Sequence, residues 1–406
     1  MTPLETQLHR FRWIILSILA IAAAASLFVG IRGAIASSKD FQWAGSVLLR
    51  AGIDPWQQAF ADNGSGIAHF SPPNYLHELY IILLPLSLLT FRHAAEIWCC
   101  VTILLSIATM YLLKNLFALP APTTLGLLLL LWMSTPFRTT LQVGQMGMME
   151  MFLLSIVFCT TNSTLRGLAL GFSFSKYSFA PVVVSFLWFK RNIRTLTIAA
   201  CVPLFALVMA WGLLGSRPLT TLAVEPFAVS RIRVWPGMAD LMTAIEATFA
   251  HLLPHFTRGK TLAYIIGLIA SGCYGYFLSR RRITNAAQLT LIAVASLFTV
   301  KHLMYDYIFL VIPLCYALSE RGRALRNIAV PLIFVFWFMD KLFPLLPLNA
   351  TPTTAQWLTS VAGCIMLGTL LTYLTWSILR IERAFFASRT RAEKRAAIHA
   401  EALSAA

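Results

Sequence analysis

The chain has 406 residues, of which 58% are hydrophobic and 12% charged, and its formal net charge is +16 at pH 7. Soluble domains carry about 25% charged residues, so this composition excludes an ordinary soluble enzyme, a disordered chain and a coiled coil. The basic residues fall mostly in short clusters between apolar runs, which indicates membrane orientation and not a nucleic-acid partner. The seven cysteines lie inside apolar runs without metal-ligand spacing. We therefore expect no disulfide framework, metal or cofactor.

Apolar runs follow one another along the chain, and most approach the ~20 residues needed to cross a bilayer. The first begins behind a short basic segment and is long for a signal-peptide core, so we expect a retained anchor there. The runs cover residues 13–31, 75–91, 94–113, 121–137, 145–161, 167–189, 195–215, 261–279, 286–304, 307–319, 327–339 and 356–379. The sequence therefore predicts an all-α polytopic membrane protein of about 12 transmembrane helices.

Lysine and arginine in short loops mark the cytoplasmic side of a membrane protein. Such clusters follow the runs that end at residues 189, 279 and 319. They predict that both termini are cytoplasmic and that the two long polar loops, about 32–74 and 216–260, lie outside. Residues 1–379 are expected to form one integral membrane domain, followed by a basic cytoplasmic tail over 380–406. Any chemistry then belongs to the outer face of the membrane.

The first outer loop begins with a carboxylate that has two interpretations. The pattern predicts a short helix over 41–51, with Asp40 at its N-cap and Gly52 at its C-cap. A carboxylate just outside a membrane helix equally suits a general base that faces a lipid-borne substrate. The pattern alone leaves both interpretations open.

Three polar residues lie inside apolar runs, where such groups are expensive. Gln145 and Glu150 either form hydrogen bonds between helices or face a cavity. Lys176 lies near the middle of 167–189, where a lysine costs ~2.5–3.5 kcal/mol. Either it forms a structural salt bridge, or 167–189 folds as a hairpin of two short legs that lifts Lys176 to the outer face.

A second polar segment separates two apolar runs near residue 302. His302 and Asp306 are four residues apart and could share one helix face. A histidine there can exchange a proton near neutral pH. A short polar loop without a chemical role is the alternative.

The order of these motifs resembles glycosyltransferase family 87, the polyprenol-phosphate-sugar-dependent transferases of the membrane-embedded GT-C fold. The resemblance covers about residues 35–195. Tryptophan stands at position 56, where the family often has tyrosine, and four residues instead of two separate Lys176 from the next proline. The matching segments are Asp40-Phe41, the Gly-Ile-Asp-Pro-Trp turn at 52–56, Phe-Ser-Pro-Pro at 70–73, Gly144-Gln145, and the glycine-containing segment from Gly167 to Lys176.

The resemblance implies an extracytoplasmic active site, which helps to choose a topology. If 75–91 crosses the membrane, Gly144 and Gln145 lie inside. If 75–91 is an embedded outer helix, the run 121–137 delivers Arg138 and Gln145 to the outer face. We prefer the second topology because it strands fewer polar groups.

The resemblance further implies an inverting transfer of mannose, or a related hexose or pentose, from a polyprenyl-phosphate donor. The acceptor would be a lipid-linked or cell-envelope glycan, and the enzyme would reside in the bacterial inner membrane. Asp40 would be the catalytic base. The donor phosphate would be held by Lys176, Arg92, Arg138 and His302. Further substrate contacts would come from Gln145, Trp56, Tyr75 and Asp306.

Two other classes of function remain at this stage. A multi-pass secondary transporter or lipid flippase would explain the number of spans together with Lys176 and Glu150. Such proteins usually show internal repeats, and none stands out here. A non-catalytic assembly protein that kept the fold is the other alternative.

Overall fold

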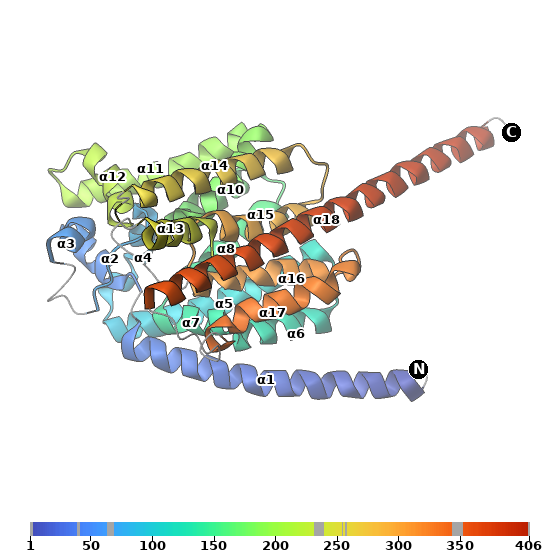
Figure 1. The fold of residues 1–406 in the computed structure, drawn as a ribbon, viewed down its shortest axis with the longest axis horizontal. Coiled ribbons are helices and arrows are strands. Elements are labelled where there is room, and N and C mark those ends of the chain that lie inside the picture. Colours follow the sequence, from blue (N-terminus) through green and yellow to red (C-terminus); the bar gives the residue numbers. More distant parts are fainter. Residues whose placement is uncertain are drawn as a thin grey trace.

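The computed structural model describes residues 3–38, 41–62, 69–230, 239–253, 255, 258–342 and 352–404. All regular secondary structure in these ranges is helical, and most helices lie side by side in an elongated bundle (Figure 1). In chain order, with η for 3₁₀ turns, the elements are α1 (Pro3–Ser37), α2 (Trp43–Arg50), α3 (Pro55–Asp62), α4 (His77–Leu83), η1 (Leu86–Leu88), α5 (Phe91–Phe117), α6 (Ala121–Met133), α7 (Thr135–Val143), α8 (Gly147–Cys159), α9 (Ser163–Ser173), η2 (Phe174–Phe179), α10 (Ala180–Phe189), α11 (Ile193–Leu214), α12 (Leu219–Ser230), α13 (Leu241–Leu252), α14 (Gly259–Ser279), α15 (Asn285–Thr299), η3 (Met304–Leu310), α16 (Val311–Leu318), η4 (Arg323–Leu325), α17 (Arg326–Leu342) and α18 (Pro352–Ser404).

Six helical stretches of the described chain are long and apolar enough to cross a membrane, or seven if the bent pair α7–α8 counts as one. This confirms the prediction of an all-α membrane protein. The six are Phe11–Ala36, Phe91–Phe117, Ser163–Phe189, Ile193–Leu214, Gly259–Ser279 and Trp357–Glu393. Helices α15 and α16 are shorter and buried almost all round, which is typical of helices at the centre of a bundle.

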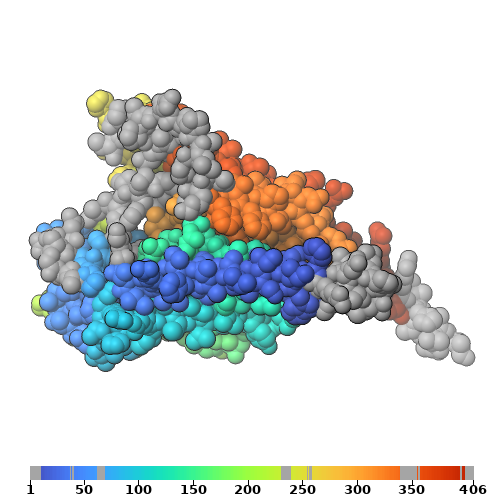
Figure 2. Space-filling view, turned by 90° about the horizontal axis from the view of Figure 1, so that it is seen from below, coloured from blue at the N-terminus to red at the C-terminus, as the bar shows by residue number. Residues whose placement is uncertain are grey.

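Helix α1 lies along the outside of the bundle, where it covers part of the surface (Figure 2). It runs in the same direction as α6 and α7. A methyl group added at Gly126 would lie 3.7 Å from Leu16, and one added at Gly30 would lie 3.2 Å from Leu141. Ser134 separates α6 from α7 and caps α7 by accepting a hydrogen bond from the Phe137 N–H. The two helices together therefore follow most of the length of α1.

The segment 163–189 does not cross the bundle in one straight helix. A methyl group on Gly167 would lie 2.9 Å from the Thr195 carbonyl oxygen, and one on Gly171 would lie 2.8 Å from that of Ala199. Helices α9 and α11 therefore run side by side in the same direction. A straight helix from Gly167 to Phe189 would be about 33 Å long. Thr195 lies beside Gly167 but follows Phe189 by only six residues, which are too few to cover that distance. The structure therefore forms the hairpin, which was one of the two interpretations of this segment of the sequence.

The apex of this hairpin is at Lys176, where the backbone leaves the helical region with φ −114° and ψ 74°. The rings of Phe158 and Phe186 contact each other at 6.3 Å. Phe158 lies at the end of α8, shortly before α9, and Phe186 lies near the end of α10. The end of the second leg therefore lies near the start of the first.

The predicted helix over 41–51 forms, but it starts later than expected. Helix α2 begins at Trp43 with Gln42 at the N-cap, so the prediction that Asp40 caps this helix is wrong. At the other end, Gly52 has a φ of 74°, the left-handed conformation that favours glycine directly after a helix. The prediction that a glycine ends the helix is confirmed, one position beyond the cap.

The apolar run 75–91 is too fragmented to cross a membrane. It contains α4, which has seven residues, and η1, with Pro85 between them. Seven helical residues cover only about 10 Å. The next long helix, α5, begins at Phe91. This supports the topology in which 75–91 is not a crossing.

The bundle has two chemically different ends. The start of α1 and the later part of α18 lie toward the same end of the bundle, well apart from each other (Figure 1). There, Glu382 of α18 accepts hydrogen bonds from the Thr284 N–H (2.8 Å) and from the Tyr316 hydroxyl (3.2 Å). The arginine-rich connections after α10, α14 and α16 lie at this end, which we call the basic end. The opposite end carries the α7–α8 turn and the apex of the hairpin, and we call it the site end.

The close approach of α9 to α11 generates a first prediction. A Gly171→Ala substitution places its methyl group against Val202 and the Ala199 carbonyl, and overpacking of this kind costs about 1–3 kcal/mol. We expect the thermal unfolding midpoint in detergent to fall by several degrees. The matched control is Gly212→Ala on α11, where a methyl group meets nothing within 4 Å. Equal midpoints for both variants would contradict the packing described here.

Candidate functional site

Three polar residues from distant parts of the sequence meet at the site end. The Lys176 ammonium at the hairpin apex donates to Oδ1 of Asp306. Nδ1 of His302 lies 3.1 Å from the other oxygen, Oδ2. The side chains of these residues are 10%, 3% and 1% exposed in the order Lys176, Asp306, His302. Both interpretations of Lys176 are therefore correct. The hairpin places the residue at the site end, and a buried salt bridge joins it to Asp306.

Local backbone geometry explains how Asp306 is positioned. It lies in the first turn of η3, where its carboxylate also accepts the Leu303 N–H at 3.3 Å. The carboxylate thus receives hydrogen bonds from the backbone, from Lys176 and from His302. Tyr305 places its ring 4.9 Å from the Lys176 ammonium. These contacts fix both members of the ion pair, which is what a buried pair requires.

His302 keeps one ring nitrogen unused. Its ring packs on Phe179 with centroids 4.3 Å apart, and its backbone N–H donates to Asp240 at 3.4 Å. Nε2 is buried without a hydrogen-bond partner. With the Nδ1 proton directed at Asp306, Nε2 accepts a hydrogen bond when the ring is neutral and donates one when it is charged. Asp240 itself caps α13, and burial raises the pKa of its carboxyl group to about 6.

Glu150 of α8 lies close enough to interact electrostatically with Lys176 and Asp306. The residue is 1% exposed, and neither of its buried carboxyl oxygens has a hydrogen-bond partner among the described residues. A buried polar group without a partner is costly, and inside a membrane such residues usually mark function. The sequence singled out Glu150 as a polar residue at membrane depth but did not assign it to this site.

The α7–α8 turn joins the cluster from another side. Gln145 is fully buried and accepts a hydrogen bond from the Tyr75 hydroxyl at 2.7 Å. Gly144, with a φ of 72°, packs against Phe41 and Ser38. Asp40 lies outside the described residues. Ser38 and Phe41, the described residues nearest to it in sequence, therefore pack at the turn that carries Gln145.

Two contacts join the turn and the ion-pair cluster into one site. A methyl group on Gly147, two residues after Gln145, would lie 3.6 Å from Oδ1 of Asp306. The Leu76 N–H, next to Tyr75, donates to the Ser175 carbonyl at 3.2 Å. The structure therefore brings together Lys176, His302, Asp306, Gln145 and Tyr75, as the sequence predicted.

Three other predicted site residues that the structure describes make no direct polar contact with this cluster. Trp56 is buried and packs on His77 and Tyr80. Arg92 begins α5, where its largely exposed side chain pairs with Glu96 at 3.1 Å. Arg138 is half-buried and contacts Thr135 at 3.5 Å. Their roles as substrate contacts stay predictions.

A groove of 440 Å³ lies beside the site, between α4, α9 and α11. Its charged lining residue is Glu78, which is 1% exposed and whose carboxyl oxygens are buried and find no hydrogen-bond partner in the part of the chain that the structure describes. Burial raises the pKa of Glu78 to about 7. The apolar lining is Ile81, Ile82, Leu168, Phe172, Ile198, Cys201, Val202, Phe205 and Ala206. The sequence could have indicated this group, because Glu78 is a carboxylate inside an apolar run.

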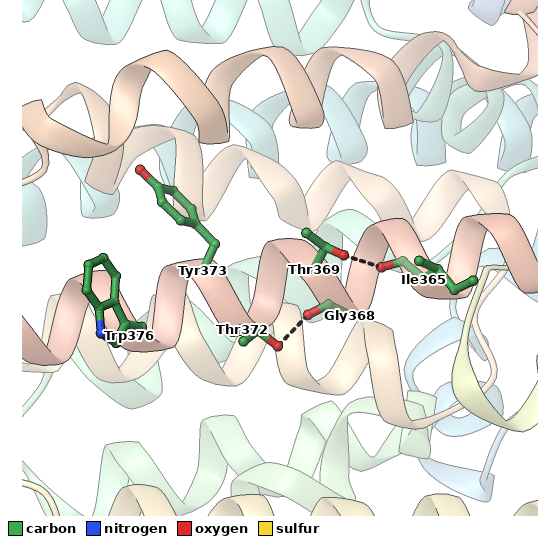
Figure 3. Close-up of a pocket in the computed structure, with 6 residues that line it drawn as sticks. All are labelled: Ile365, Gly368, Thr369, Thr372, Tyr373 and Trp376. Atoms are coloured by element: carbon green, nitrogen blue, oxygen red, sulfur yellow. Dashed lines mark hydrogen bonds between the residues drawn. The ribbon is translucent and has the colours of Figure 1, made fainter.

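A second groove, of 560 Å³, lies along α18 (Figure 3). Its threonine hydroxyls donate within the helix, Thr369 to Ile365 and Thr372 to Gly368, each at 2.8 Å. Neither hydroxyl proton is thus available to a ligand. This groove presents no charged side chain, unlike the cluster at the site end.

Fold and site together define an all-helical integral membrane protein with a buried, charged site at one end of its bundle. The model of glycosyltransferase family 87 matches residues 79–313, more than half of the chain. The protein belongs to glycosyltransferase family 87, and its activity class is that of a membrane glycosyltransferase. Comparison with curated proteins and with solved structures gave no match.

The ion pair generates a second prediction. Lys176→Met leaves the Asp306 carboxylate buried without its cation, and breaking a buried pair on one side costs about 3–5 kcal/mol. We expect a large fall in the thermal unfolding midpoint in detergent. Adding Asp306→Leu should recover part of this loss, since it removes the stranded charge. Arg92→Met, which breaks an exposed pair, should change the midpoint little. Equal effects of Lys176→Met and Arg92→Met would contradict the assigned pairing.

Proposed function

We propose that this protein is an inverting glycosyltransferase that transfers a sugar from a polyprenyl-phosphate donor to a lipid-linked or cell-envelope glycan acceptor. The reaction would take place at the extracytoplasmic face of the bacterial inner membrane. The observation that carries the proposal is a buried cluster of charged groups, in a family 87 chain, at the end of the bundle opposite the arginine-rich loops. Family membership favours this function over the transporter or flippase alternative.

The proposed topology has twelve crossings with both termini cytoplasmic. Parallel packing of α1 with α6–α7, and of α9 with α11, supports it. So does the parallel course of α5 and α8, whose later parts approach through Cys159 and Leu112. The crossings would be α1, α5, α6–α7, α8, the two short hairpin legs α9 and α10, α11, α14, α15, η3 together with α16, α17 and α18. Positive residues at the basic end then lie inside, as the orientation rule requires.

Asp40 is the proposed catalytic base. It would take the proton from the acceptor hydroxyl as that oxygen forms a bond to the anomeric carbon of the sugar. The bond from this carbon to the phosphate oxygen breaks on the opposite face, so the configuration inverts and polyprenyl phosphate leaves with the electron pair. The packing of Ser38 and Phe41 on Gly144 supports a base at this place, because it directs that segment toward the Gln145 turn.

Lys176 and His302 are the proposed contacts of the donor phosphate. An ammonium has three donors, and Asp306 takes one of them. His302 has its buried Nε2 unused. Fixed cations in a low-dielectric site stabilise a leaving anion, so these two residues suit the phosphate that departs. Arg92 and Arg138 are proposed as further cations for the donor.

The groove between α4, α9 and α11 is the proposed channel for an apolar substrate chain. Leu168 and Phe172 at its edge are about 40% exposed, so it opens toward the lipid. It begins at Glu78, two residues from the Leu76–Ser175 hydrogen bond that borders the site. A lipid chain in this groove would keep its headgroup next to the cluster. The sugar is proposed to be mannose or a related hexose or pentose.

The third prediction tests the base. Asp40→Asn removes the ability to take a proton while keeping the size of the side chain, so turnover should fall by ~10²–10⁴-fold. Donor binding and thermal unfolding should stay near those of the unsubstituted protein. The assay uses protein in lipid nanodiscs with a panel of radiolabelled polyprenyl-phosphate sugars. Turnover within a few-fold of the unsubstituted protein would remove Asp40 from the mechanism.

The fourth prediction tests the topology. In a protein stripped of native cysteines, Ala51→Cys at the end of α2 should react with a membrane-impermeant maleimide in spheroplasts. Arg194→Cys at the basic end should react only after the membrane is permeabilised. Both positions are exposed, so burial does not limit either reaction. The reverse pattern would place the site end in the cytoplasm and overturn the orientation.

A further inference from the structure

A basic pocket of 290 Å³ lies at the basic end, between the end of α14 and the middle of α18. The glycosyltransferase site described above does not use it, because it lies at the other end of the bundle. Its rim is formed by arginines and its floor by apolar side chains. The lining residues are Arg280, Arg281, Arg282, Ile283, Leu379, Arg383 and Phe386.

Aromatic rings position three of these arginines. The guanidinium of Arg280 lies 5.0 Å from the ring centre of Tyr276, and that of Arg281 lies 4.6 Å from the ring centre of Phe277. Arg282 lies 4.6 Å from the ring centre of Phe386, across on α18. A guanidinium on a ring keeps its N–H groups available for hydrogen bonds to a planar or tetrahedral anion. The stacking therefore fixes donors around the pocket before any ligand arrives.

The described residues supply no carboxylate to these arginines. Glu382, the nearest in sequence, is fully buried and directs its oxygens to Thr284 and Tyr316. The exposed carboxylates at this end pair elsewhere, Glu320 with Arg323 and Glu393 with Arg389. Nε of Arg281 is buried without a hydrogen-bond partner. Several positive charges thus converge on one small pocket without a counter-ion among the described parts of the chain.

The pocket lies at the level where lipid headgroups would be expected. Trp188 and Trp376 are 59% and 62% exposed, and Tyr276, which packs on Phe189, is 44% exposed. Exposed tryptophan and tyrosine near the ends of membrane helices mark the interface between lipid and water. The apolar lining of the pocket includes Ile283, which follows α14, and Leu379 of α18, and both side chains are buried.

We propose that this pocket binds the phosphate headgroup of an anionic membrane lipid. The arginines would donate to the phosphate oxygens, and the floor would receive the first carbons of the chains. Basic pockets between membrane helices on the cytoplasmic side commonly serve this purpose. A bound lipid would connect α14 to α18, and so tie the long C-terminal helix to the bundle. The proposal does not depend on the catalytic function.

The simpler explanation is that these arginines only orient the protein in the membrane. In that case any two arginines at the basic end should contribute equally to lipid binding. The chain offers a matched pair at the same end. Arg191 and Arg194 are exposed, follow α10 and lie outside the pocket. Removing them changes the net charge by the same amount as removing Arg280 and Arg282.

The test is native mass spectrometry of the full chain in detergent, titrated with phosphatidylglycerol or with phosphatidylcholine of the same chains. We expect one saturable phosphatidylglycerol adduct and no equivalent phosphatidylcholine adduct. Arg280→Gln/Arg282→Gln should weaken the adduct by roughly 30-fold, since each basic residue near an anionic lipid contributes on the order of fivefold. Arg191→Gln/Arg194→Gln should leave it within a few-fold. Thermal unfolding in detergent without added lipid verifies that both double variants fold.

Three results would overturn the proposal. Equal loss in the two double variants would mean that net charge alone attracts the lipid. Equal binding of phosphatidylcholine would mean that the anionic headgroup is not selected. Displacement of the adduct by millimolar inorganic pyrophosphate, with a direct pyrophosphate adduct in its place, would assign the pocket to a soluble phosphate. If Arg280→Gln/Arg282→Gln fails to fold, Arg280→Lys/Arg282→Lys applies the same test, because lysine keeps the charge but loses the planar donor fork.

Discussion

The buried pair of Lys176 and Asp306 is the interaction on which the site end depends. A lysine at membrane depth cannot stay charged without an anion, and a carboxylate there needs a cation. The pair joins residues 130 positions apart, so it fixes the hairpin of the first half of the chain against the turn that opens α16. The apex of the hairpin carries the lysine that reaches that carboxylate. One ion pair therefore determines both a reversal of the chain and the meeting of its two halves.

Among the described residues, several buried polar groups around this pair do not contribute a hydrogen bond to the packing of the helices. Asp306 is satisfied by three donors, yet within the described parts of the chain Nε2 of His302 and both oxygens of Glu150 are buried without hydrogen-bond partners. Unsatisfied groups of this kind cost stability, and they persist at sites that receive a polar ligand. The cluster thus resembles a prepared site and not a simple brace between helices. That character agrees with membership of a membrane glycosyltransferase family.

Each end of the bundle has a groove or pocket that combines apolar side chains with ionisable ones. At the site end, an apolar groove between α4, α9 and α11 begins at the carboxyl group of Glu78. At the basic end, an apolar floor between α14 and α18 is rimmed by arginines. Each combines surface for a lipid chain with a polar group for its head. The first would receive the chain of a lipid substrate whose headgroup reaches the cluster, and the second the headgroup of an anionic phospholipid.

Much could be predicted from the sequence because membrane insertion acts on local composition. The apolar runs predicted the helical membrane class, and the cost of Lys176 inside such a run indicated either a salt bridge or a hairpin, both of which the structure contains. The motif order through Gln145 and Lys176 resembled the family that the match then showed. The start of α2 was predicted wrongly, because Asp40 has the right chemistry for a cap but the helix begins beyond Gln42. What sequence could not decide is which polar groups meet. In lipid a helix can be apolar all round, so hydrophobic periodicity does not reveal the face that packs inward. The partner of Lys176, the unpaired state of Glu150 and the pocket between α14 and α18 follow only from the tertiary packing.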